Sequence, residues 1–107
     1  DTVRGPDVAY WSFARLPADQ TPVVFANVAP ELVAEVVSPS NTRKQIARKV
    51  REYFALGTAL VWVVDPDDRT VTVYHQPGDG RVLWDDATLT AGDVLPGFAC
   101  PVAELFA

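Results

Sequence analysis

The 107-residue sequence contains one cysteine, one histidine and no methionine. A single cysteine, Cys100, excludes a disulfide within the chain, and we interpret it as a small buried apolar residue. One cysteine and one histidine are also too few for a structural zinc site. Because His75 ends an expected hairpin strand, we interpret it as partly exposed, and a Ser–His–Asp catalytic set is not credible.

Long hydrophobic runs and targeting signals are missing as well. No apolar stretch approaches the roughly 20 residues needed to span a bilayer, and no basic start followed by an apolar segment marks a signal peptide. The glycine-rich nucleotide-binding patterns Gly-x-x-x-x-Gly-Lys and Gly-x-Gly-x-x-Gly do not occur. We therefore expect a cytoplasmic protein without a membrane partner.

The charge balance is acidic, with 9 Lys and Arg against 14 Asp and Glu and a net charge of -5. This argues against a strongly electropositive nucleic-acid surface, although bound divalent cations would offset carboxylate charge locally. The length suits one compact domain. Because a strand pattern begins almost at the first residue, we expect residues 1–107 to form a single domain that lacks its N-terminal segment.

Apolar patterning predicts five strands, at residues 8–11, 32–37, 60–64, 70–75 and 81–84. Prolines predict an irregular loop at 14–22. Gly92, Pro96 and Gly97 are interpreted as turns near the end of the domain. A short helical turn is expected at 101–106.

A helix is expected between the second and third strands. Thr42 and Gln45 match a capping box, with Asn41 as an alternative cap, and Gly57 suits the C-terminal stop. Between them, apolar residues recur at the spacing of one buried helix face; they are Ile46, Val50, Tyr53 and Phe54. A helix between two buried strands predicts a parallel crossover, and the hairpins then add antiparallel strands. We expect a mixed sheet with a helix packed on it.

Glu35 is the residue that most needs explanation. Strand alternation places it on one face with Val33 and Val37, inside an otherwise apolar run. A buried, unpaired carboxylate costs several kcal/mol, so this one must be paired with a cation, protonated or bound to a metal. From the spacing alone, a structural ion pair and a functional role are about equally supported.

Two further side chains could join Glu35. Asp7 follows Pro6 at the entrance of the first strand, where it suits either an ordinary turn or a shared Mg²⁺ site. Lys49 lies at the edge of the buried helix face, where it could extend to solvent or reach over the sheet. The other basic residues of the helix suit either a solvated face or phosphate contacts; they are Arg43, Lys44, Arg48 and Arg51.

Five short segments resemble the Uma-two family, a large bacterial group classed as restriction endonucleases of the PD-(D/E)XK nuclease superfamily. In chain order they are Pro-Asp-Val-Ala at 6–9, Leu-Val-Ala-Glu-Val-Val-Ser-Pro-Ser at 32–40, Lys49 with Tyr53 and Gly57, Trp-Val-Val-Asp-Pro at 62–66, and Leu-Pro-Gly-Phe at 95–98. The resemblance extends from Pro6 to Phe106. It implies an α/β, restriction-endonuclease-like fold, with a mixed β-sheet and flanking helices.

The resemblance also implies roles for individual residues. Asp7 and Glu35 correspond to the two metal-binding acids, for Mg²⁺ or Mn²⁺. The superfamily lysine normally follows the second acid by two residues, where this chain has Val37, and Lys49 on the helix takes its place. Gln45 stands where relatives often carry an acid. The implied catalytic set is therefore Asp7, Glu35 and Lys49.

Three hypotheses follow. The first is a metal-dependent endonuclease that hydrolyses phosphodiester bonds in nucleic acid, with DNA favoured, in which Lys49 orients water or stabilises developing negative charge. The second is a non-catalytic interaction domain on a nuclease-like scaffold, which Val37 and the acidic net charge support. The third is a homodimer formed through an open sheet edge and exposed tryptophans, drawn from Trp11, Trp62 and Trp84, of which Trp62 is expected in the core.

The surroundings of Glu35 discriminate between the first two hypotheses. Convergence of Glu35 and Lys49 near Asp7 would favour the nuclease. A pair between Glu35 and an arginine, with Asp7 facing solvent, would favour the interaction domain.

Overall fold

The structure is a computed structural model that describes residues 7–12, 15 and 28–107. A five-stranded sheet contains β1 (Val8–Tyr10), β2 (Leu32–Val36), β3 (Leu60–Asp65), β4 (Thr70–Tyr74) and β5 (Gly80–Leu83). A second sheet contains β6 (Thr88–Ala91) and β7 (Leu95–Pro101), and the helices are α1 (Arg43–Ala55) and α2 (Val102–Leu105). Of the loop expected at 14–22, only Arg15 lies within the described residues.

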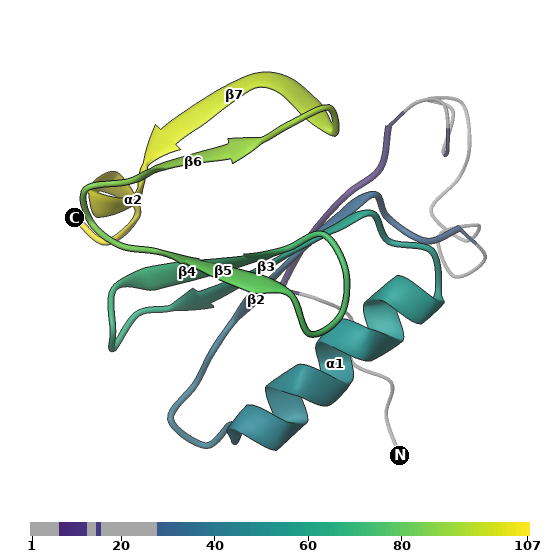
Figure 1. Cartoon of the computed structure of the whole chain (residues 1–107), viewed down its shortest axis with the longest axis horizontal. Helices are drawn as coiled ribbons and strands as arrows, with labels where there is room; N and C mark the ends of the chain where they lie inside the picture. Colours follow the sequence, from purple (N-terminus) through teal and green to yellow (C-terminus); the bar gives the residue numbers. More distant parts are fainter. Residues whose placement is uncertain (1–6, 13–14, 16–27) are drawn as a thin grey trace.

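The five-stranded sheet is mixed, as predicted. Its order is β1-β2-β3-β4-β5, with β2 and β3 parallel and the other neighbours antiparallel. The helix α1 supplies the crossover between the two parallel strands and covers one face of the sheet, while β6, β7 and α2 lie over the other (Figure 1). The predicted α/β class, with a mixed sheet and flanking helices, is confirmed.

Local sequence signals position α1. The Thr42 hydroxyl accepts the Gln45 N–H at 3.1 Å, and Gln45 Oε1 accepts the Thr42 N–H at 2.9 Å, so the predicted capping box forms. After the helix, Gly57 adopts a φ of +109°, which a residue with a Cβ rarely tolerates. The sequence signals that predicted the two ends of the helix, the capping box and Gly57, therefore also fix those ends in the structure.

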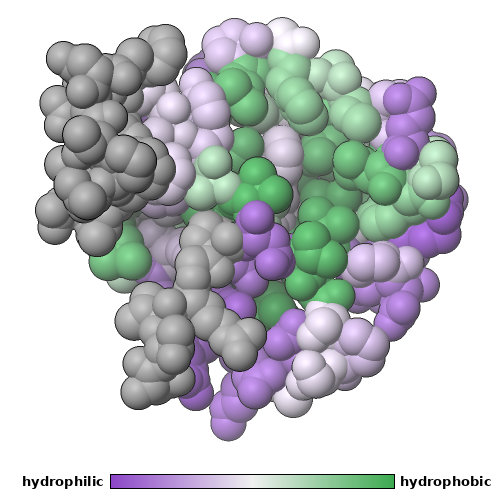
Figure 2. Space-filling model, turned by 180° about the vertical axis from the view of Figure 1, so that it is seen from behind, coloured by the Kyte–Doolittle hydropathy of each residue, from purple (hydrophilic) through white to green (hydrophobic). Residues whose placement is uncertain are grey.

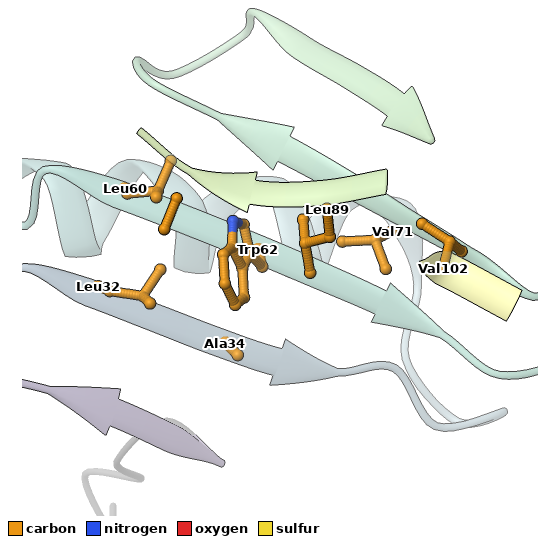
Figure 3. Packing of buried hydrophobic residues seen from close by; sticks show 8 residues of the cluster. Leu32, Ala34, Leu60, Trp62, Val71, Leu89 and Val102 are labelled. Carbon is orange, nitrogen blue, oxygen red and sulfur yellow. The ribbon is translucent and has the colours of Figure 1, made fainter. Parts of the chain in front are cut away.

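Strand alternation divides the core between the two sheet faces. Toward α1, a small cluster of Val50, Val61 and Val63 is packed by Ile46, Tyr53, Phe54 and other half-buried residues. Toward β6 and β7, a larger cluster joins the sheet to the second layer (Figure 3); its buried members are Leu32, Ala34, Leu60, Trp62, Val71, Leu89, Ala91 and Val102. The expectation that Trp62 belongs to the core is confirmed, since it is 8% exposed.

After residue 91 the structure differs from the prediction. Gly92 lies in a turn, as predicted, but Pro96 and Gly97, interpreted as turn residues, lie inside β7, which pairs antiparallel with β6. A register shift at Thr90/Ala91 and a φ of +85° at Gly97 accommodate them. Cys100, predicted to be buried, is half-buried in β7, whereas the short closing helix exists as α2.

The length of the helices and the distribution of surface residues are two further features of the fold. Neither helix in the described part of the chain has the length and apolar character needed to cross a membrane. Seen from behind (Figure 2), hydrophobic residues gather across the middle of the molecule, and hydrophilic residues lie below them, at the level of α1. His75 is exposed at the end of β4.

Candidate metal and catalytic site

The register of β1 and β2 brings two acidic residues together. Val8 pairs with Ala34 in this antiparallel ladder, so continuing it by one residue sets Asp7 opposite Glu35. Residues directly opposite each other in such a ladder point to the same sheet face. Asp7 Oδ2 also accepts the backbone N–H of Val36 at 2.7 Å, which ties its carboxylate to the end of β2.

Glu35 is the buried half of this pair. It is 5% exposed and lies on the α1 face of β2. Lys49 Nζ lies 3.1 Å from its Oε1, and the Tyr53 hydroxyl donates to its Oε2 at 2.5 Å. Lys49 and Tyr53 are one helical turn apart on α1, so a single helix flank supplies both donors.

Burial and the nearby negative charges change the pKa of the Tyr53 phenol. Burial, the hydrogen bond to Glu35 and then the charges of Glu35, Asp7 and Glu52 raise the pKa of the Tyr53 phenol well above its ordinary value of 10.0. The phenol therefore keeps its proton in neutral solution and acts as a donor. The contribution of Asp7 means that its carboxylate is close enough for its charge to act on this group.

The donor chemistry suits a hard divalent cation. Mg²⁺ is commonly bound by one or two carboxylates, with waters completing its coordination, and Asp7 and Glu35 supply that set. Asp7 Oδ1 has no hydrogen-bond partner among the residues that the structure describes, and each Glu35 oxygen retains a lone pair beyond its present bond. No group of three or more His, Cys, Asp or Glu residues that could hold a metal occurs in the described part of the chain. The arrangement fits Mg²⁺ or Mn²⁺ bound mainly by water.

The structure places each predicted site residue. Glu35 and Lys49 are in contact, and Asp7 lies beside the same strand end. Val37, which stands where the superfamily lysine is expected, packs with the apolar cluster beneath α1. Gln45 is engaged in the capping box.

Tyr53 is the site residue that the sequence reasoning missed. Its spacing predicts a place in the apolar stripe of the helix, and it belongs to one of the segments that resemble the family, but neither observation gives it a role at the site. The available signal was its position four residues after Lys49, on the flank that reaches Glu35. A tyrosine there can bury its ring and still present its hydroxyl to the carboxylate.

The fold is α/β, with helices flanking a mixed sheet, and it places Asp7 and Glu35 near one end of β2. A family model for Uma2, whose description is "Putative restriction endonuclease", matches residues 1–103, so the chain belongs to this family, the one given above as Uma-two. Comparison with curated proteins gives no match.

A solved structure supports the same fold. It is the crystal structure of a putative nuclease belonging to DUF820 from Anabaena variabilis, which is 23% identical, with a TM-score of 0.76. The match covers 94% of this chain and 58% of that one, so this chain spans less than two thirds of the length of that protein. At this identity the similarity establishes the fold.

Proposed function

We propose that the chain is the core of a metal-dependent endonuclease that hydrolyses phosphodiester bonds, with DNA as the favoured substrate. The observation that carries the proposal is a buried carboxylate, Glu35, held by Lys49 and placed beside a second carboxylate, Asp7. Fold stability alone seldom favours such a charge within an apolar strand, because burying it costs several kcal/mol. Membership of the Uma2 family supports the same function.

In this proposal Asp7 and Glu35 would hold Mg²⁺ or Mn²⁺. When bound, such an ion lowers the pKa of a coordinated water and offsets charge on a phosphate. Lys49 would hold its positive charge next to the phosphate, where negative charge develops during hydrolysis. Tyr53 is a positioning residue: its hydroxyl fixes the orientation of the Glu35 carboxylate.

Calorimetric titration with Mn²⁺ tests the site directly. We expect wild-type protein to bind Mn²⁺ and both Glu35→Gln and Asp7→Asn to lose measurable binding. Glu104→Gln and Asp93→Asn are matched controls, since both remove an exposed carboxylate outside the site, and they should titrate like wild type. Circular dichroism establishes that each variant is folded. Retained binding in folded Glu35→Gln would contradict the proposal.

Cleavage of a supercoiled plasmid in the presence of Mn²⁺ tests the activity. Lys49→Met should abolish nicking while Mn²⁺ binding persists, because Lys49 acts on the phosphate and is not a metal ligand in this proposal. Arg81→Met, which removes an exposed basic side chain from the opposite face of the sheet, should nick at the wild-type rate. Equal nicking by the two variants would remove Lys49 from the mechanism.

A second candidate function is a non-catalytic interaction domain on the same scaffold. Both Glu35 oxygens already accept hydrogen bonds from Lys49 and Tyr53, so the carboxylate is satisfied without a metal. The position two residues later is the apolar Val37. Failure of wild-type protein to bind Mn²⁺ would favour this function over the nuclease.

Three further expectations remain proposals: a single domain over residues 1–107, a cytoplasmic location, and a homodimer. For the homodimer, Trp62 is buried in the core and Trp11 is half-buried, with its indole N–H donating to Val28 O, which leaves Trp84 as the exposed tryptophan. Light scattering over a concentration series would test the dimer.

A further inference from the structure

Positive charge in this acidic chain is concentrated on one helix. Five of the 9 Lys and Arg residues lie in α1, namely Arg43, Lys44, Arg48, Lys49 and Arg51, and Glu52 is its single acid. The rest of the chain keeps four basic residues against thirteen acidic ones. A polyanion is therefore attracted to α1 and repelled by most of the remaining surface.

The sheet beside this helix carries the β4–β5 shelf, formed by the half-buried Thr72 and Tyr74 and the exposed Val82 and Trp84. Tyr74 packs on the cluster under α1, and a Cβ built on Gly80 would meet both the Tyr74 ring and Thr72, so these residues share the α1 face. Alternation along β5 adds Val82, and one further step adds Trp84. Val82 is 46% exposed and Trp84 58% exposed.

The sheet register connects the shelf to the candidate site. Glu35 pairs with Val63, Val63 with Thr72, and Thr72 with Val82, in one row across the sheet. Three strand spacings of about 4.8 Å place Val82 roughly 14 Å from Glu35. The shelf therefore lies on the same face as the acidic pair, and a short oligonucleotide is long enough to contact both.

Helical geometry places Arg51 on the shelf side of α1. Lys49 and Tyr53 contact Glu35 on β2, so the flank that carries them faces β2. At 3.6 residues per turn, Arg51 lies on the opposite flank, toward β4 and β5, whereas Arg43, at the start of the helix, lies in line with Val50 and Phe54. Both are exposed, and neither forms an ion pair within the described residues.

We infer that the β4–β5 shelf and this flank of α1 bind single-stranded nucleic acid. An unpaired base stacks on Trp84, and a backbone phosphate contacts Arg51. A duplex keeps its base faces stacked inside and cannot use Trp84 in this way, whereas an exposed indole beside basic side chains suits an open strand. The inference rests on the proposed nuclease function only in naming its substrate class, since the contacts themselves need no metal.

Fluorescence anisotropy of a labelled oligothymidylate, in EDTA and low salt, tests the shelf. Trp84→Ala should weaken binding roughly tenfold, and Trp84→Phe should restore most of the affinity because it retains a stacking face. Leu105→Ala is the control, because Leu105 is an exposed apolar residue on α2, away from the shelf. Equal affinities for wild type and Trp84→Ala would overturn the inference.

Salt dependence separates phosphate contact from stacking. Arg51→Gln should lower the slope of log K against log salt by about 0.7, the value for one phosphate of a single strand, whereas Trp84→Ala should leave the slope unchanged. Arg81→Gln is the matched control, since Arg81 is exposed on β5 but pairs with Val73, which faces the opposite cluster. A slope that falls equally in both arginine variants would overturn the inference.

The use of EDTA keeps this result separate from that of the metal titration. Oligonucleotide binding that depends on Trp84 and Arg51, in a protein that binds no Mn²⁺, would support the shelf while the nuclease proposal fails. Mn²⁺ binding without any binding of single strands, or tighter binding of a duplex of the same length, would overturn the shelf and leave the nuclease proposal standing.

Discussion

The two faces of the five-stranded sheet differ in the kind of side chain that they bury. The face toward β6 and β7 is covered by a large apolar cluster, while the face toward α1 buries a small cluster of valines and a carboxylate. The polar groups differ accordingly. The indole N–H of Trp62, on the first face, has no partner in the described part of the chain, whereas both oxygens of Glu35, on the second, accept hydrogen bonds.

The apolar face therefore contributes mainly to stability, whereas the face toward α1 holds the groups of the candidate site. An apolar layer tolerates one unpaired N–H because burial of many side chains offsets its cost. A buried carboxylate has no such compensation, and its neighbours must be specific donors at specific positions. Substitutions on the two faces should therefore have different kinds of effect.

The largest loss of stability is expected on the apolar face. Leu89, in β6, is 1% exposed, and Leu89→Ala should lower the free energy of unfolding by about 3 kcal/mol, because it leaves a cavity between the layers. Urea denaturation measures this. Leu105→Ala, at an exposed position, should cost under about 0.5 kcal/mol. Similar small losses in both would mean that β6 and β7 are not an integral part of the core.

A smaller loss is expected when the carboxylate loses its charge partner. Lys49→Met leaves Glu35 buried beside an apolar side chain and should cost about 2 kcal/mol, less than for a fully buried pair because the lysine side chain is 33% exposed. Adding Glu35→Gln should recover part of this loss, which a double-mutant cycle in urea would measure. Strictly additive losses would mean that the pair is not coupled.

Tyr53→Phe should have a moderate effect that depends on pH. Removing the hydroxyl should cost about 1 kcal/mol at neutral pH, because Glu35 loses a donor. The folded state raises the pKa of Tyr53, so its contribution is fully present below the unfolded value of 10.0 and is lost as pH rises above it.

Stability measured in urea between pH 8 and pH 11 provides the check. The wild-type advantage over Tyr53→Phe should shrink at the alkaline end of that range. An advantage that grows with pH would contradict the assigned direction of the pKa shift.

An effect of similar size, without the pH dependence, is expected at the helix start. Thr42→Ala removes one half of the capping box and should cost about 1 kcal/mol. Because α1 holds the donors to Glu35, the same change should also weaken Mn²⁺ binding slightly if the site is as proposed. Ser40→Ala, outside the capping box, should be close to neutral in thermal unfolding.

Much of the fold could be predicted because local signals agree with tertiary structure. The capping box at Thr42, the stop at Gly57 and the apolar run of β2 each specify an element by themselves. The β6–β7 pair was missed because Pro96 and Gly97 disfavour strands in general. A two-stranded layer tolerates them, since fewer backbone groups there need partners within a sheet.

The candidate site could be predicted only in part. Glu35 was identifiable because a charge inside an apolar strand is costly, and Lys49 because of its angle on the helix. The contact between Tyr53 and Glu35, and the placement of Asp7 opposite Glu35, depend on the crossover and on strand register. Neither can be inferred from a pattern along one element.

The two acids of the site belong to parts of the sheet with different connectivity. Glu35 lies on β2, which has a neighbouring strand on each side, whereas Asp7 precedes β1, a three-residue strand at the edge of the sheet that the described residues form. Short edge strands open locally at a lower free energy than central strands. Amide hydrogens of β1 should therefore exchange before those of β2 and β3, and each opening would carry Asp7 away while Glu35 stays with Lys49. The strand order therefore allows Asp7 to separate reversibly from Glu35 while the core stays folded.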